Sequence, residues 1–176
     1  MAASNAVSDR RAIVALGANL PHEGLAGAAL LAAGVAATEE AGLRVLRRSS
    51  VWASPAWPQP SDQPDYTNAI VEIDATAIEP RALLEALMAI ERRFGRDRRE
   101  RWAARTMDLD IVDFAGLVLD EPGLTLPHPR AHERAFVLAP LAEAAPDWCH
   151  PVLRRTAAEL LAGLGDASVR RLDNGR

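Results

Sequence analysis

The sequence predicts one α+β domain of the ferredoxin-like type, with an antiparallel or mixed sheet flanked by helices. Three observations predict it. Segments 12–16, 66–74 and 106–114 are short and apolar or alternating, as strands are, and helix-length segments lie between them. Their order, strand, helix, strand, strand, helix, strand and then further helices, is the ferredoxin-like pattern. A chain of 176 residues with 49% hydrophobic and 25% charged residues fits one domain with a substantial core.

The first half of the chain is expected to hold a strand, a helix and a second strand. Residues 12–16 form an apolar run that ends at Gly17, which indicates a buried strand followed by a turn. Residues 22–41 are rich in alanine and leucine and predict a helix. Residues 43–52 alternate imperfectly, so we expect an edge strand. Four prolines lie between residues 54 and 64, which indicates an ordered loop because proline cannot donate to a strand ladder.

A strand over residues 66–74 and a helix over residues 79–94 follow. Alternation along the strand assigns Ala69, Val71 and Ile73 to the core face and Tyr66, Asn68, Ile70 and Glu72 to the opposite face. The helix has a proline near its start, an apolar stripe at helical spacing, and Gly95 where a C-terminal cap belongs.

The last part of the chain predicts one more strand and two helices. Residues 106–114 form the strand, and residues 124–129 form a loop with two prolines. Residues 131–145 predict a helix interrupted by Pro140, and residues 156–161 a short final helix.

Charge and composition exclude several classes of protein. The net charge is −4 and the pI about 5.6, so we expect no nucleic acid partner, because proteins that coat nucleic acids carry a basic surplus. All 20 basic residues are arginine. The absence of lysine excludes a P-loop and Schiff-base chemistry. Phosphate must therefore be bound by arginine, histidine, backbone amides or metal.

The chain is expected to work as a monomer in the cytoplasm. Its single cysteine, Cys149, cannot form an internal disulfide and gives no zinc spacing. Residues 1–11 lack the apolar core of a secretory signal and are expected to be a flexible extension of a single domain over residues 12–176. The longest apolar run, residues 28–37, is too short to span a bilayer, so no membrane is expected as a partner.

Asp108 and Asp110 carry the strongest chemical signal. They lie two positions apart in a predicted strand, so they share one face and are separated by roughly 6.6 Å along it. Their repulsion is relieved by a shared hard cation, and magnesium binds a few carboxylates together with phosphate oxygens. The alternative is a solvated acidic face on an ordinary strand.

Seven arginines immediately precede this pair, between Arg92 and Arg105. Planar guanidinium groups bind phosphate with two hydrogen bonds and spread the charge of a transition state. Arginines beside a magnesium-binding pair are what phosphoryl transfer without a P-loop requires. A solvated loop or a nucleic-acid patch is the alternative explanation.

Other polar and aromatic residues are weaker candidates. Glu91 lies at the edge of an apolar helical stripe, where its carboxylate needs a donor, an adenine amino group or an arginine. Tyr66, Trp102 and Phe136 are aromatic rings near polar clusters, which stack on a flat heterocycle or pack in the core. His128 either touches phosphate or has a structural role in its loop.

Four stretches carry a resemblance to a known family, 14–20, 62–68, 101–111 and 124–129. The chain resembles the 6-hydroxymethyl-7,8-dihydropterin pyrophosphokinases of the folate pathway over residues 12–150. The resemblance implies a transferase that moves pyrophosphate from ATP to 6-hydroxymethyl-7,8-dihydropterin and releases AMP. It also implies two Mg²⁺ ions as cofactors.

The resemblance assigns roles to individual positions. It implies that Asp108 and Asp110 bind both metal ions, and that Arg96 and Arg98 close over the phosphates in catalysis. The residues implied to contact ATP are Glu91, Arg98, Arg105, Ile111, Thr125, His128 and Arg134. The residues implied to form the pterin pocket are Ser54, Pro55, Trp57, Tyr66, Asn68, Trp102 and Phe136.

Two other functions are compatible with the same residues. The first is an RNA-binding module of this fold class that uses the arginines, although carboxylates on a central strand would repel phosphate unless metal intervenes. The second is a paralogue that binds pterin without turnover, against which the intact aspartate pair counts.

Overall fold

The structure is a computed structural model that describes residues 10–56, 62–95, 106–165 and 168–172. Its main sheet is antiparallel and runs in the order β5-β1-β4-β3-β8, with β2 also paired to β4. These strands are β1 (Arg11–Ala18), β2 (Val45–Arg48), β3 (Trp52–Ser54), β4 (Tyr66–Asp74), β5 (Asp108–Phe114) and β8 (Arg170–Arg171).

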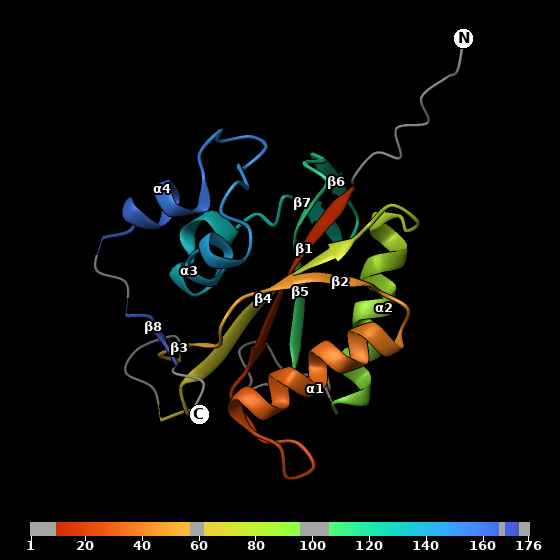
Figure 1. Cartoon of the computed structure of the whole chain (residues 1–176), viewed down its shortest axis with the longest axis vertical. Helices are drawn as coiled ribbons and strands as arrows, with labels where there is room; N and C mark the ends of the chain where they lie inside the picture. Colours follow the sequence, from red (N-terminus) through yellow and green to blue (C-terminus); the bar gives the residue numbers. More distant parts are fainter. Residues whose placement is uncertain (1–9, 57–61, 96–105, 166–167, 173–176) are drawn as a thin grey trace.

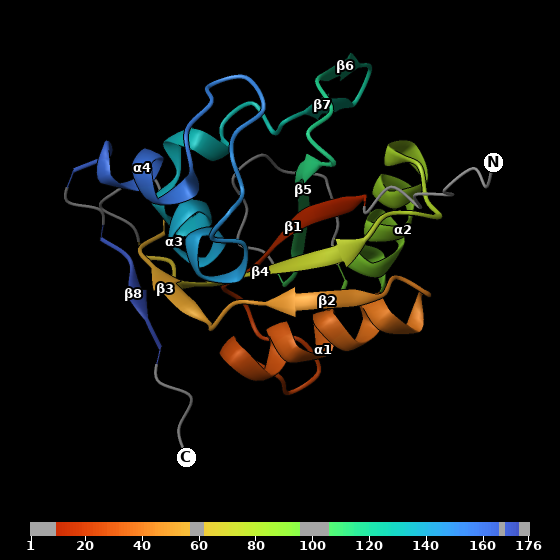
Figure 2. The same ribbon diagram turned by 45° about the horizontal axis from the view of Figure 1, so that its top comes forward.

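Helices cover the two faces of this sheet unequally (Figures 1 and 2). α1 (Gly27–Glu40) and α2 (Pro80–Arg93) cover one face. The 3₁₀ turn η1 (Ala131–Glu133), α3 (Ala135–Ala144) and α4 (Ala157–Ala162) cover part of the other. The chain order β1, α1, β2 and β3, β4, α2, β5 confirms the predicted ferredoxin-like α+β fold.

The elements with regular periodicity lie where the sequence predicted them. β4 has the predicted bounds, and its Val71 and Ile73 belong to the core beneath α1 and α2. Ile70 belongs to a second core beneath α3, as alternation requires. α2 begins at Pro80, buries an apolar stripe, and is followed by Gly95 with φ +72°, a conformation that glycine adopts without strain.

Several bounds differ from the prediction because tertiary contacts override local patterns. α1 begins at Gly27, since His22 and Leu25 instead exchange backbone hydrogen bonds in a turn. The single strand predicted over 43–52 is two strands, β2 and β3, both paired to β4. α3 continues through Pro140 and is not interrupted there, because its neighbours Leu138 and Leu141 are fully buried against the sheet.

Three strands were not predicted. The segment expected to be a loop at 124–129 contains β7 (Leu124–Leu126), which pairs with β6 (Leu119–Glu121) in a hairpin. β8 near the C-terminus pairs with β3. The predicted flexible extension falls mostly on residues 1–9, which lie outside the described residues, while β1 begins one residue before the predicted domain start.

β5 contains a bulge next to the part of the strand that carries Asp108 and Asp110. Its register against β1 shifts by one residue between Ile13 and Val14, so Val112 has no partner of its own. The Val112 carbonyl instead accepts a hydrogen bond from the His128 backbone N–H at 2.9 Å. The bulge therefore joins the strand that carries the aspartates to the segment that carries His128. In the described part of the chain, no helix has the length and apolarity to cross a membrane.

Candidate active site

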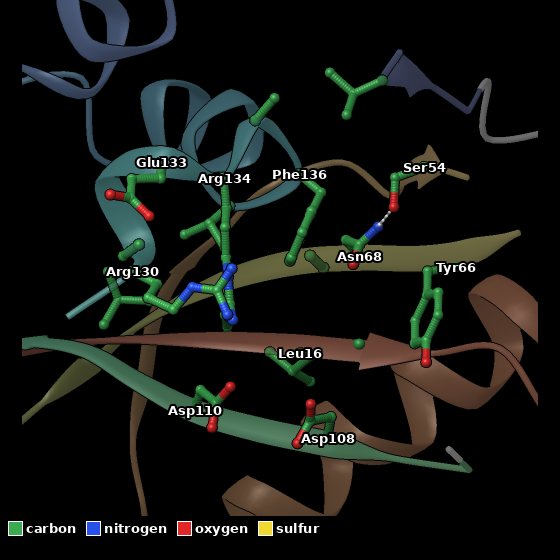
Figure 3. Close-up of a pocket in the computed structure, with 18 of the residues that line it drawn as sticks. Leu16, Ser54, Tyr66, Asn68, Asp108, Asp110, Arg130, Glu133, Arg134 and Phe136 are labelled. Carbon is green, nitrogen blue, oxygen red and sulfur yellow. Dashed lines mark hydrogen bonds between the residues drawn. The ribbon is translucent and has the colours of Figure 1, made fainter. Parts of the chain in front are cut away.

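A cavity of about 580 Å³ opens on the part of the sheet that α3 and α4 leave uncovered (Figure 3). β1, β4 and β5 form its floor, and η1 with the start of α3 forms one wall. Ser54 and Pro55 at the end of β3, with Ser168 and Val169 before β8, line it as well. Three strands that are far apart in the sequence thus contribute side chains to one hollow.

Asp108 and Asp110 both line this cavity from β5. Figure 3 shows the two carboxylates rising from the same face of the strand. Leu109, between them, lies in the core on the opposite face. The small residues Ala15 and Gly17 of β1 lie opposite Asp110 and Asp108 in the register, so the floor beside the carboxylates stays open.

Cationic and imidazole groups lie across the cavity from the carboxylates. Arg130 and Arg134 extend from the η1 segment toward β5 (Figure 3). The Nδ1 atom of His128 accepts a hydrogen bond from the Arg130 backbone N–H at 3.1 Å. Burial lowers the pKa of His128, while nearby Asp110 acts in the opposite direction. A neutral His128 must then carry its proton on Nε2, where it can donate to an anion.

The other end of the cavity is aromatic and amide-lined. Tyr66 and Asn68 come from β4, and Phe136 comes from α3 (Figure 3). Asn68 is buried, and its Nδ2 donates to Ser54 Oγ at 2.9 Å, which fixes the orientation of the amide. The Arg134 guanidinium lies 5.6 Å from the Phe136 ring centre, a cation–π distance that connects the two ends.

Three predicted ATP contacts do not line the cavity. Glu91 is buried beside β5 and accepts the Leu109 N–H. Ile111 points into the core with Leu109, because both alternate with the aspartates. Thr125 is exposed in the β6–β7 hairpin, where its hydroxyl donates to Asp120. Their assignment to ATP stays a prediction.

Five other predicted site residues lie outside the described residues. They are Trp57, Arg96, Arg98, Trp102 and Arg105.

The structure adds residues to the cavity that sequence reasoning missed. Arg130 and Glu133 carry charge into it from η1. The His-Pro-Arg run at 128–130 was a signal for Arg130, since this arginine follows directly after a candidate residue. Ser168 and Val169 gave no signal, because only the pairing of β8 with β3 brings them to the cavity.

The fold and the site together define a class: a ferredoxin-like α+β enzyme with paired carboxylates facing arginines across one cavity, an arrangement suited to phosphate groups. The family model for 7,8-dihydro-6-hydroxymethylpterin-pyrophosphokinase matches residues 13–146. The chain therefore belongs to this family, whose members are diphosphotransferases.

Named relatives agree with the family match. The chain is 40% identical over 166 residues to the 2-amino-4-hydroxy-6-hydroxymethyldihydropteridine pyrophosphokinase of Methylorubrum extorquens, covering 93% of this chain and 99% of that protein. It is 45% identical over 121 residues to the enzyme of that name from Synechocystis, covering 69% of this chain and 60% of the relative's length.

Solved structures share the fold. The wild-type Plasmodium falciparum HPPK-DHPS structure with SDX-DHP matches with a TM-score of 0.66 at 13% identity, covering 88% of this chain and 44% of that chain. A second wild-type structure of that protein gives a TM-score of 0.64 with the same coverage. The present chain thus spans less than half of that longer protein.

Proposed function

We propose that this chain transfers pyrophosphate from ATP to 6-hydroxymethyl-7,8-dihydropterin, giving AMP and the pterin diphosphate, in folate biosynthesis. One observation carries the proposal: a single cavity holds a carboxylate pair, facing arginines, and an aromatic, amide-lined end. Those are the groups needed for a metal, polyphosphate and a flat heterocycle. A cytoplasmic monomer remains our expectation from the sequence.

The carboxylate pair fits magnesium. Within the described residues, no group of three or more histidine, cysteine, aspartate or glutamate side chains could hold a metal ion. Magnesium does not need such a group, since it binds one or two carboxylates and completes its shell with substrate phosphates and water. We therefore propose that Asp108 and Asp110 hold two Mg²⁺ ions together with ATP. Bound there, magnesium would neutralise phosphate charge and lower the pKa of the attacking hydroxyl.

The aromatic end fits a pterin ring. Tyr66 and Phe136 offer ring faces for stacking. The Asn68 amide already donates through Nδ2 to Ser54, so its carbonyl oxygen is oriented to accept from a ring N–H. A ligand without a matching N–H donor would leave this buried carbonyl oxygen without a hydrogen bond, which costs binding free energy. The site would therefore favour a heterocycle that carries such a donor.

The residues of the chain serve mainly to position and to stabilise charge. The hydroxymethyl oxygen attacks the β-phosphorus of ATP, a C–O–P link forms, and the bond from this phosphorus to the oxygen bridging the α-phosphate breaks. AMP leaves with that oxygen, and the hydroxyl proton passes to water. Arg130, Arg134 and the Nε2–H of His128 lie on the wall where they could stabilise the transferring phosphates.

The test is to incubate the protein with ATP, magnesium and the reduced pterin and to separate AMP from ADP. We expect AMP and pterin diphosphate in equal amounts, with neither formed when pterin is omitted. ADP as the nucleotide product would overturn the proposal. Tight pterin binding without AMP would instead identify a non-catalytic paralogue, and magnesium-independent, salt-sensitive RNA binding would favour the RNA-binding alternative.

A further inference from the structure

Glu91 is a buried acid that the proposed chemistry does not use. It lies in the last turn of α2 and is 1% exposed, although most neighbours on its stripe are apolar. Its Oε1 accepts the backbone N–H of Leu109 at 2.8 Å. A carboxylate is costly to bury unless it is hydrogen-bonded. The hydrogen bond from Leu109 therefore offsets part of the cost of burying Glu91.

The backbone amide that Glu91 binds lies on the outer edge of the sheet. β5 is the edge strand of the described sheet and pairs only with β1 there. An edge strand presents one row of backbone N–H groups that no neighbouring strand binds. The Leu109 N–H is satisfied by Glu91 from that side. The carboxylate thus takes the place of a strand for one residue.

That residue lies between the two aspartates. Leu109 directs its side chain into the core beneath α1 and α2, while Asp108 and Asp110 direct theirs into the cavity. The peptide group that Glu91 binds links Asp108 to Leu109. Restraining its rotation restrains the direction of both carboxylates, which repel one another when no cation lies between them.

We propose that Glu91 is a positioning residue that sets the spacing of the Asp108–Asp110 pair through its hydrogen bond to the Leu109 amide. The functional part rests on the proposed function, because it assumes that the pair binds a divalent cation. The structural part stands on the hydrogen bond alone. Glu91 would have a different role if it only prevented another strand from pairing with β5. In that case its replacement would not alter the affinity for the cation.

Two variants separate the role of the acceptor from the role of bulk. Glu91→Gln keeps an oxygen that can accept the Leu109 N–H, whereas Glu91→Met fills similar space with no acceptor. Glu91→Asp keeps the charge but is one methylene shorter, and it serves if the methionine variant does not fold. Glu85→Met, an exposed position on the same helix, controls for the loss of a helix charge.

The first measurement is amide hydrogen exchange by NMR in the absence of ligands. We expect Leu109 exchange to be about tenfold faster in Glu91→Met and Glu91→Asp, relative to a central-strand amide such as Val71, and little changed in Glu91→Gln. Unchanged Leu109 exchange in both acceptor-deficient variants would overturn the structural part of the proposal.

The second measurement is Mn²⁺ binding by electron paramagnetic resonance in the presence of a non-hydrolysable ATP analogue. We expect affinity to fall about 10-fold in Glu91→Met and Glu91→Asp, as for other residues that orient metal ligands, and to change less than about threefold in Glu91→Gln and Glu85→Met. Equal Mn²⁺ affinity in all variants would overturn the positioning role. If the wild type binds Mn²⁺ but forms no AMP, the proposed function fails while this result stands.

Discussion

The two faces of the sheet are built from the same strands and yet have opposite properties. Toward α1 and α2, β1, β4 and β5 present side chains such as Leu16, Val71 and Leu109, each at most 3% exposed. Toward the cavity, the same strands present Gly17, Asn68 and Asp108, all of which line open space. The comparison shows how one short strand contributes to stability and to chemistry at alternate positions.

This division of roles permits two like charges on one strand. Two carboxylates on one strand repel, and they are tolerated because burial on the opposite face stabilises that strand independently. Residues on the packed face are therefore expected to govern unfolding, and residues on the cavity face to govern turnover. Four predictions test that separation.

The largest effect is expected on the cavity face, at the aspartates. Replacing Asp108 or Asp110 with alanine should lower AMP formation by about a thousandfold or more, because the proposed cation ligands are lost. The unfolding temperature should change little, since both side chains face the cavity and not the core. Coupled AMP assays and thermal unfolding measure the two effects. Asp147→Ala, at an exposed acid in the loop after α3, is the control. An active, destabilised Asp108 variant would contradict the separation.

Leu87→Ala should have the converse effect on the packed face. Leu87 of α2 is fully buried, so its truncation should lower the free energy of unfolding by about 2–5 kcal/mol. Turnover per folded molecule should change little. Urea unfolding and active-site titration check this, with half-buried Leu84→Ala expected to cost less. A large loss of turnover in the fully folded variant would show that the faces are coupled.

Gly17→Val tests the floor of the cavity. A Cβ atom at Gly17 would lie 3.6 Å from Asn68 Oδ1 and 4.0 Å from Asp108 Cβ, which is ordinary contact. The fold should accept it to within about 1 kcal/mol, because a β-branched residue suits a strand. The catalytic efficiency should fall about 10- to 100-fold as the side chain enters ligand space. Gly17→Ala should be intermediate, and unaltered kinetics with Gly17→Val would show that ligands do not reach this floor.

The smallest expected effect is on stability at low pH, at His150 in the loop after α3. Burial lowers the pKa of His150, and nearby His132 lowers it further. Its Nδ1 accepts the N–H groups of Val152 and Leu153, each at 3.2 Å. The folded-state pKa is below the unfolded one, so the contribution is present above about pH 6.5 and is lost as pH falls through the folded pKa.

We expect the free energy of unfolding, measured with urea, to fall between pH 7 and pH 5. His150→Gln keeps an acceptor and should flatten this slope. Identical slopes for the two proteins would mean that His150 does not titrate with unfolding.

Periodic segments were predictable and short ones were not. Apolar residues recur in β4 with the two-residue period of a strand and in α2 with the 3.6-residue period of a helix. The bounds and buried faces of both elements therefore follow from the sequence. β6 and β7 have three residues each, too few to display alternation, although Pro122 and Gly123 between them are turn residues. β8 consists of two exposed arginines, and only its partner β3 makes it a strand.

The same distinction applies to the site. The shared direction of Asp108 and Asp110 follows from the two-residue period of a strand, and the structure confirms it. Arg130 and Glu133 lie in an irregular segment whose direction is set by packing on the sheet, so no local pattern predicts where they point. The position of Glu91 at the edge of the stripe predicts that its carboxylate needs a donor, but it does not reveal that this donor is the Leu109 N–H at the start of edge strand β5.

The C-terminal segment that reaches the cavity has a consequence for selective inhibition. Ser168 and Val169 line the cavity, yet they lie beyond residues 13–146, the part of the chain that the family model describes. A compound confined to the floor between β4 and β5 would contact only residues within the span that the family model matches. A compound extended past Pro55 toward Val169 would also contact a wall that this definition does not include, and its affinity would depend on the particular sequence found there.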